Sequence, residues 1–227
     1  MRLGELNWME VETLVKKDDR LIIVLGACEE HGYLSLLTDV KIPFSLADAA
    51  SQRTGVLVAP PVNFGCSPYF TTYPGTISLR AATLMDLTED IVRSVTGYGF
   101  KRLLFLNGHG GNLPAKARLN ELINVLPGVK MAWYSWWMEP NVTEAAAKHG
   151  LKSGHANWIE AFSFVKAGDL PKGEKTPIQA HTILNAAETR KVYGDGVTGG
   201  LYEADEAIMD DIFAAALKDV LELLKFK

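Results

Sequence analysis

Apolar positions along the chain fall into two alternating kinds of run. Short apolar runs stand at 21–25, 56–59, 102–106 and 129–134, and the run at 21–25 has no polar alternation, which is typical of strands buried on both faces of a sheet. Apolar residues at helical spacing predict helices at 6–17, 83–98, 113–126 and 203–226, with shorter ones at 42–50 and 142–149. Strands that alternate with helices predict an α/β fold, a three-layer α/β/α sandwich with a mostly parallel sheet.

Several connections between these elements have their own character. Residues 62–82 are rich in glycine, proline and aromatic side chains, and so long a connection in a compact domain is usually functional or part of an interface. The stretches 168–176 and 193–200 are also expected to be loops, the second one dense in glycine. The helix at 42–50 is expected to carry Pro43 in its first turn.

Composition limits the classes of protein that this chain can represent. Its 227 residues are 48% hydrophobic and 22% charged, which suits one globular domain spanning residues 1–227. The net charge of −4 and the absence of lysine and arginine blocks argue against a nucleic-acid partner. Two cysteines make no disulfide framework, the first residues do not read as a signal peptide, and no apolar run approaches the ~20 residues of a membrane span. We therefore expect a soluble cytoplasmic protein.

The sequence Asn-Gly-His-Gly-Gly-Asn at 107–112 lies between a predicted strand and a predicted helix. Ligands of open α/β sheets bind beyond the carboxyl ends of the strands, and glycines let a ligand approach the backbone closely. His109 is the one metal-ligand or acid–base side chain of the six. The hexapeptide alone is equally compatible with a ligand-binding turn and with a tight turn that happens to contain a histidine.

A second group of candidate ligands follows the first predicted strand. Glu29 and His31 are two residues apart and project to the same side of an extended chain, and Asp39 follows at the start of a helix, where the helix dipole favours a carboxylate. Because the carboxyl ends of parallel strands share one edge, these side chains and His109 can converge. Such a set suits Zn²⁺, Mn²⁺ or Fe²⁺, and more carboxylates than one ion needs suggest two ions with a bridging carboxylate.

Other reactive side chains are assigned ordinary roles. Glu30 is interpreted as a solvated loop carboxylate, His149 and His181 as surface residues, and Cys28 as a residue packed in the core. Four tryptophans, at 133, 136, 137 and 158, fit a core, an interface or the wall of a pocket for a small, flat substrate. We favour the pocket, and Trp136, Trp158 and Tyr73 are the candidate substrate-binding residues.

Several motifs in order carry a family resemblance. The chain contains ELNWMEVETL near its start, then GACEEHG followed by TD, YPGTISL at 73–79, NGHGGN at 107–112, and GHA with a glutamate at 154–160. Together these resemble the creatininase family of metal-dependent amidohydrolases over about residues 3–165, with GDGVTGG at 194–200 similar to a late glycine loop.

The resemblance implies an α/β/α fold with a binuclear centre of divalent metal, often zinc or manganese, in a homohexamer. Matched residue by residue, the expected metal ligands are Glu29, His31, Asp39, His109 and Glu160. Asp39 would be the bridge. His155 matches the histidine expected to transfer a proton to the leaving group.

Three departures from the family pattern bear on the substrate. The family's usual EQHGPHLPLGTD is one residue longer than EEHGYLSLLTD here and has a second histidine, so the mouth of the site is expected to differ. Gly111 stands where creatininase itself has a glutamate, which makes creatinine a doubtful substrate. Trp158 replaces a carboxylate of the family's GExETS segment.

The expected activity is hydrolysis of an amide-type, non-peptide C–N bond in a small cyclic or formylated compound by metal-activated water. Within the family, hydrolysis of a peptide bond or opening of a cyclic ketone are alternatives. A non-catalytic, metal-stabilised binding protein is a competing hypothesis from another class. A cysteine hydrolase using Cys28 or Cys66 is a third, and it would be inactivated by alkylation and not by chelators.

Overall fold

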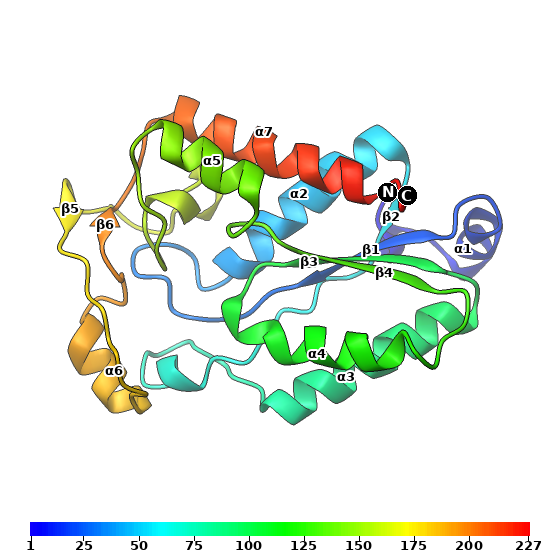
Figure 1. Ribbon diagram of the computed structural model, residues 1–227, viewed down its shortest axis with the longest axis horizontal. Helices are drawn as coiled ribbons and strands as arrows, with labels where there is room; N and C mark the ends of the chain where they lie inside the picture. Colours follow the sequence, from blue (N-terminus) through cyan, green and yellow to red (C-terminus); the bar gives the residue numbers. More distant parts are fainter.

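The computed structural model describes residues 1–227, and a parallel four-stranded sheet forms its centre (Figure 1). The strand order is β2-β1-β3-β4. The strands span Arg20–Leu25 (β1), Leu57–Val58 (β2), Arg102–Asn107 (β3) and Lys130–Ser135 (β4). β1 pairs with β3 over its full length, from Arg20 opposite Arg102 to Leu25 opposite Asn107. The predicted parallel sheet is confirmed, and all four strands lie within two residues of the predicted ranges.

Helices cover both faces of this sheet, as the alternating pattern predicts. In Figure 1, α2, α5 and α7 lie on one side of the strands and α3 and α4 on the other, while α1 lies beyond one end. The helices span Trp8–Val15 (α1), Thr38–Thr54 (α2), Ala81–Gly97 (α3), Leu113–Leu122 (α4), Pro140–Lys148 (α5), Ala186–Tyr193 (α6) and Glu206–Leu223 (α7). The fold is therefore the three-layer α/β/α sandwich.

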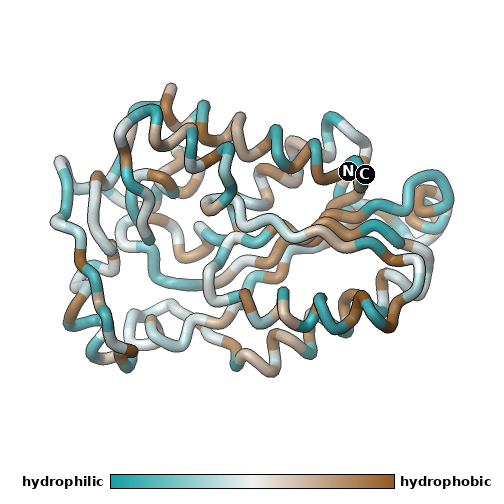
Figure 2. Tube along the Cα trace, viewed as in Figure 1, coloured by the Kyte–Doolittle hydropathy of each residue, from teal (hydrophilic) through white to brown (hydrophobic).

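Each strand contributes alternate side chains to two hydrophobic cores. Ile22 and Val24 belong to the core beneath α2, α5 and α7, whereas Leu21 and Ile23 belong to the core beneath α3 and α4. Figure 2 shows the hydrophobic colouring concentrated along the strands. Burial on both faces explains why the strand at 21–25 has no polar alternation. None of the helices combines the length and the hydropathy that crossing a bilayer requires.

Helix α2 begins four residues earlier than the pattern predicts. It starts at Thr38, so Pro43 lies inside the helix and not in its first turn. Proline has no N–H and cannot donate to the carbonyl of Asp39, four residues before it. That carbonyl lies against the turn after β3, as described below, and Asp39 itself occupies the first helical turn.

The segment after residue 168 holds elements that the apolar pattern does not reveal. A short antiparallel pair, β5 (Glu174–Lys175) and β6 (Gly200–Leu201), flanks α6 at the end of the molecule opposite α1 (Figure 1). Helix α6 begins with a capping box in which the Asn185 side chain accepts from the Glu188 N–H and the Glu188 carboxylate accepts from the Asn185 N–H. The Asn-x-x-Glu spacing is the sequence signal for this helix.

The strand order places a topological switch point between β1 and β3. The chain leaves β1 through α2 to reach β2 on one side, and it leaves β3 through α4, on the opposite face of the sheet, to reach β4 on the other side. Segments that diverge in this way leave space for a ligand beyond the carboxyl ends of the strands. The predicted ligand residues follow these two strands.

Candidate metal centre

Five side chains predicted as metal ligands meet beyond the carboxyl ends of β1 and β3. Two of them follow β1, one is in the first turn of α2, one follows β3 and one is in a 3₁₀ helix at Trp158–Glu160. All five are buried, and they are Glu29, His31, Asp39, His109 and Glu160. The structure therefore brings together residues that lie up to 131 positions apart along the chain.

Asp39 lies at the centre of this cluster and faces a histidine with each of its oxygens. Its Oδ1 is 3.0 Å from His31 Nε2, and its Oδ2 is 2.9 Å from His109 Nδ1. Glu160 Oε1 is 3.7 Å from His31 Nε2, and Glu29 Oε2 is 3.5 Å from His109 Nε2. Three groups of three candidate ligands result. Asp39 belongs to two of them, and the third joins Glu29 and His31 to His155.

Two backbone carbonyls and a hydroxyl, none of them a proposed ligand atom, orient the two histidines. His31 Nδ1 is 3.2 Å from the carbonyl oxygen of Glu29, and His109 Nε2 is 3.1 Å from the carbonyl oxygen of Cys66 and from Ser67 Oγ. An imidazole that donates one N–H to such a carbonyl presents its other nitrogen to a metal. These contacts leave His31 Nε2 and His109 Nδ1, the two nitrogens nearest Asp39, for ligation.

Glu160 is oriented by a backbone donor from a strained residue. The N–H of Ala156 donates to Glu160 Oε2 at 2.7 Å, which leaves Oε1 directed toward His31. Ala156 has φ of 57°, a left-handed conformation that residues with a Cβ seldom adopt. The strained residue, Ala156, is therefore in direct contact with the candidate ligand Glu160.

The turn at 107–112 requires glycine at two positions because other backbone segments approach it. A Cβ added to Gly108 would lie 1.9 Å from the carbonyl oxygen of Asp39, and one added to Gly111 would lie 1.9 Å from that of Cys66. At Gly110 the nearest atom would be 4.0 Å away. The turn at 107–112 thus packs against the backbone of Asp39 and of Cys66, and position 111 has no room for the glutamate of creatininase.

Charge and burial shift the ionisation of this cluster in opposite directions. Burial alone lowers the pKa of His109, but the carboxylates of Asp39 and Glu29 outweigh it and raise the pKa to about 9. Burial raises the pKa of Glu29. Burial also disfavours the charged form of Asp39, but the two adjacent histidines outweigh it and hold its pKa well below the usual value.

Three buried atoms of the cluster have no aligned hydrogen-bond partner: Glu29 Oε2, His31 Nε2 and Asp39 Oδ2. Unsatisfied polar atoms are costly inside a protein, and native structures contain few of them. Oxygen and imidazole nitrogen directed at a common centre are the donors that Zn²⁺ and Mn²⁺ bind. The residues present therefore fit a divalent metal.

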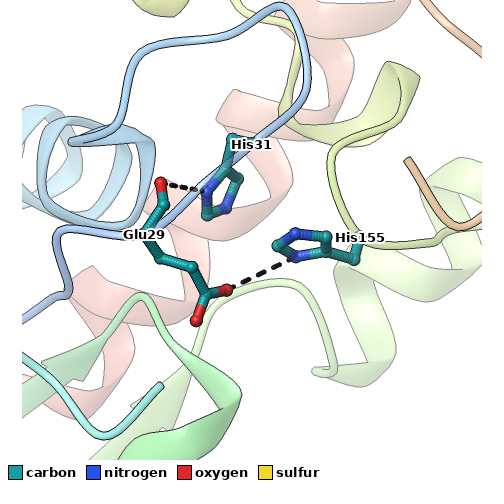
Figure 3. A group of neighbouring side chains, drawn as sticks. All are labelled: Glu29, His31 and His155. Atoms are coloured by element: carbon teal, nitrogen blue, oxygen red, sulfur yellow. Dashed lines mark hydrogen bonds and ion pairs between the residues drawn. The ribbon is translucent and has the colours of Figure 1, made fainter. Parts of the chain in front are cut away.

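His155 borders this cluster, and Glu30 is its partner. In Figure 3, Glu29 and His31 come from the segment after β1 and His155 from the segment before the 3₁₀ helix at 158–160. His155 Nδ1 is 3.8 Å from Glu29 Oε1, while Nε2 is 2.9 Å from Glu30 Oε1. Glu30 is only 5% exposed, so the interpretation of it as a solvated carboxylate is wrong. The chain after β1 turns inward, and residues from the 194–200 loop cover the Glu30 carboxylate.

A cavity of about 400 Å³ opens onto the cluster. Its apolar wall consists of Tyr69, Phe70, Trp137 and Ile159, and the candidate ligands Glu29, Asp39, His109 and Glu160 line it together with His155. The long loop at 62–82 thus supplies two aromatic side chains to the cavity.

The three side chains predicted to bind substrate do not line this cavity. Trp136 and Trp158 are 1% and 0% exposed and belong to the core beneath α2, α5 and α7, where Trp158 Nε1 donates to the Lys152 carbonyl. Tyr73 is buried against Arg190. Trp137, next to Trp136 in the chain, lines the cavity instead, and no pattern in the sequence distinguishes these two neighbours.

The remaining candidate residues lie away from the cavity or on the surface. Cys28 Sγ is half-buried and donates to the Gly75 carbonyl, and neither it nor Cys66 lines the cavity. Burial raises the pKa of both thiols, which disfavours the thiolate that a cysteine nucleophile needs. His149 pairs with Asp211 near the surface, and His181 is exposed.

A parallel α/β/α sandwich with buried carboxylates and histidines at its switch point defines a class of α/β proteins with a candidate metal centre. The profile of the Creatininase family, described as creatinine amidohydrolase, matches residues 4–224. The chain belongs to the creatininase family, as the motifs predict.

Comparison with individual proteins gives the same family. The chain is 34% identical to the creatinine amidohydrolase of Pseudomonas putida over 117 residues, which are 48% of this chain and 45% of that protein. It is 36% identical to the mycofactocin precursor peptide peptidase of Mycobacterium ulcerans over 123 residues, 50% of this chain and 49% of that protein. The matched part spans about half the length of these curated relatives.

A solved structure of a tryptophan-to-phenylalanine mutant of creatininase, Type II, matches 99% of this chain and 97% of its own. Its TM-score is 0.83 at 22% identity, which shows a shared fold.

Proposed function

We propose that this chain is a binuclear metal-dependent hydrolase that cleaves an amide-type, non-peptide C–N bond of a small cyclic or formylated compound. The observation that carries the proposal is the position of Asp39 between His31 and His109, one histidine facing each carboxylate oxygen. A carboxylate in this position is suited to bridge two cations, and each proposed ion has a further carboxylate nearby. Glu29 would complete one group and Glu160 the other.

When bound, the two divalent cations lower the pKa of a water molecule and polarise the substrate carbonyl. Solved creatininase structures include one described as a manganese form and one as a Zn–Zn type, which supports zinc or manganese for this chain, with Fe²⁺ a third candidate. The proposed ligands are Glu29, His31, Asp39, His109 and Glu160.

His155 is proposed to carry the proton of this reaction. It borders the cavity, and the two groups that share Asp39 do not include it, although it forms a third candidate group with Glu29 and His31. Its Nδ1 is on the side of Glu29 and would deliver a proton to the departing nitrogen. Phe70 is stacked on the ring with centroids 4.8 Å apart, which holds the imidazole in place at the edge of the cavity.

The cavity supports a small substrate with a flat, apolar part. Its volume of about 400 Å³ is near the lower end for ligand pockets, and Tyr69, Phe70 and Trp137 supply aromatic surface. Creatinine itself is not proposed, because Gly111 replaces the glutamate of creatininase and the Cys66 carbonyl occupies the space of a side chain there.

The test begins with metal analysis of the purified protein, followed by a screen of small lactams and formamides with native protein and His155→Ala. We expect two divalent ions per chain and turnover that His155→Ala reduces by roughly 100-fold or more. A protein that binds no divalent metal would refute the binuclear site. Full turnover by His155→Ala on a confirmed substrate would refute the proton-transfer role.

A peptidase is the second candidate, and the 36% identity to the mycofactocin precursor peptide peptidase favours it. The same screen should therefore include short peptides, whose hydrolysis with no turnover of lactams would decide for this candidate. The expected homo-oligomer, a hexamer by the family resemblance, is a further proposal that light scattering tests.

A further inference from the structure

A buried glutamate outside the proposed ligand set makes the closest contact to His155. Glu30 Oε1 is 2.9 Å from His155 Nε2, and this pair joins residues 125 positions apart. We propose that Glu30 is the positioning residue of His155, holding the N–H of its ring at Nε2 so that Nδ1 faces the cavity. This inference rests on the proposed function, which assigns proton transfer to His155, and adds to it the residue that orients that histidine.

Contacts from two sides hold the carboxylate of Glu30 in place. Its Oε2 accepts from the N–H of Gly32 at 3.1 Å, and the N–H of Glu30 donates to Thr76 Oγ1 at 3.0 Å. From the opposite side, a Cβ on Gly196 would lie 1.7 Å from Oε2, so the 194–200 loop packs directly on the carboxylate. With Oε2 engaged by Gly32, Oε1 is left for His155.

His155 is fixed in the same way at its backbone. Its N–H donates to Thr198 Oγ1 at 3.0 Å, and its carbonyl accepts from the Thr198 N–H at 3.2 Å. Phe70 stacks on the ring, with planes 16° apart. What remains to be determined is which ring nitrogen carries the proton. An ionised carboxylate can accept a hydrogen bond but cannot donate one, so the nitrogen that faces Glu30 must carry the N–H.

The three histidines of the site share one arrangement, with one difference. Each has one ring nitrogen next to an acceptor that is not a proposed ligand atom and the other next to a carboxylate of the cluster. For His31 and His109 the outer acceptor is a backbone carbonyl, whereas for His155 it is the carboxylate of Glu30. A charged acceptor makes the opposite nitrogen more basic than a carbonyl does, which suits a residue that must take up and release a proton.

The first test locates the proton and needs no substrate. Zinc-loaded protein with ¹⁵N-labelled histidine is compared by NMR with Glu30→Met, which removes the acceptor at similar volume, and Glu30→Gln, which keeps an acceptor oxygen. His155→Ala assigns the signals, and Glu174→Met, at an exposed site on β5, is the matched control. We expect Nε2–H in native protein, Glu30→Gln and the control, and loss of this preference in Glu30→Met.

The opposite results overturn the proposal. A native spectrum with Nε2 of His155 unprotonated refutes it even if Glu30→Met does not fold, and an unchanged His155 signal in folded Glu30→Met refutes it as well.

The second test uses a compound that the screen shows to be turned over. Glu30→Met should lower kcat by roughly 10- to 100-fold, the usual cost of removing such a partner, with KM within about twofold, and Glu30→Gln should recover most of the loss. An unchanged kcat with a raised KM would instead assign Glu30 to substrate binding and refute the positioning role. If no compound is turned over, the proposed function fails, while the NMR result still decides where the proton of His155 lies.

Discussion

Replacing each glycine of the turn at 107–112 with alanine separates the glycines that the site requires from one that it does not. At Gly108 and Gly111 the new Cβ would lie 1.9 Å from a backbone oxygen, whereas real Cβ atoms essentially never approach closer than 3.0 Å. Main-chain segments must then separate by about 1 Å, an overpacking that costs about 2–3 kcal/mol, near the upper end for such changes. Gly110→Ala meets no atom closer than 4.0 Å and is the matched control.

The assay is thermal unfolding of the metal-free proteins, followed by zinc titration. For a chain of this length a loss of 2–3 kcal/mol lowers Tm by roughly 4–12 °C. Zinc affinity should fall as well, because Gly108→Ala displaces the backbone of Asp39 and Gly111→Ala displaces the Cys66 carbonyl that lies next to His109 Nε2. Gly110→Ala should stay within about 2 °C of the native protein. Equal Tm values for all three variants would refute the close-approach argument.

Four further outcomes follow from the site. Asp39→Asn should weaken zinc binding by roughly 100-fold or more, since removing a residue that only hydrogen-bonds to a metal ligand already lowers metal affinity by 10- to 100-fold. An Asp39→Asn variant that retains two zinc ions by metal analysis would contradict the shared carboxylate. The folded, metal-free pKa of His109, about 9, lies above its unfolded value, so its contribution to stability is fully present below about pH 6.5 and is lost as the pH rises through 9. Between pH 6.5 and 9.5 the Tm of the native protein should therefore fall further than the Tm of His109→Gln. Zinc binding at pH 7 should release protons, which calorimetry in buffers of different ionisation enthalpy measures. A chelator should abolish turnover that alkylation of Cys28 and Cys66 leaves intact, and the reverse would favour the cysteine hydrolase.

The class of fold can be predicted from local sequence pattern, because strands buried on both faces of a sheet appear as continuous apolar runs. The apolar run at 21–25 and the one at 102–106 are strands for the reason that their pattern predicts. Helix boundaries depend on weaker signals. The whole of α6 was missed, since a capping box and not apolar spacing marks its start, and the start of α2 at Thr38 was missed because no side-chain cap marks it.

The candidate metal centre could be predicted because its residues follow strands whose carboxyl ends must share one edge. Glu29, His31 and His109 needed only the parallel sheet to converge, and Asp39 needed only a helix start. The role of these residues as ligands stays a prediction until metal is measured. Glu160 could be predicted as a ligand only from the family motif, because it does not directly follow a strand.

The direction of side chains on irregular segments was decided by tertiary structure alone. Trp136 and Trp137 are adjacent and chemically identical, yet the first is in the core and the second lines the cavity. Glu30 next to Glu29 is buried against His155 because a glycine loop 166 positions away covers it. Regular strands and helices have a repeat that ties position to direction, whereas a loop has none, so contacts from distant parts of the chain determine where its side chains point.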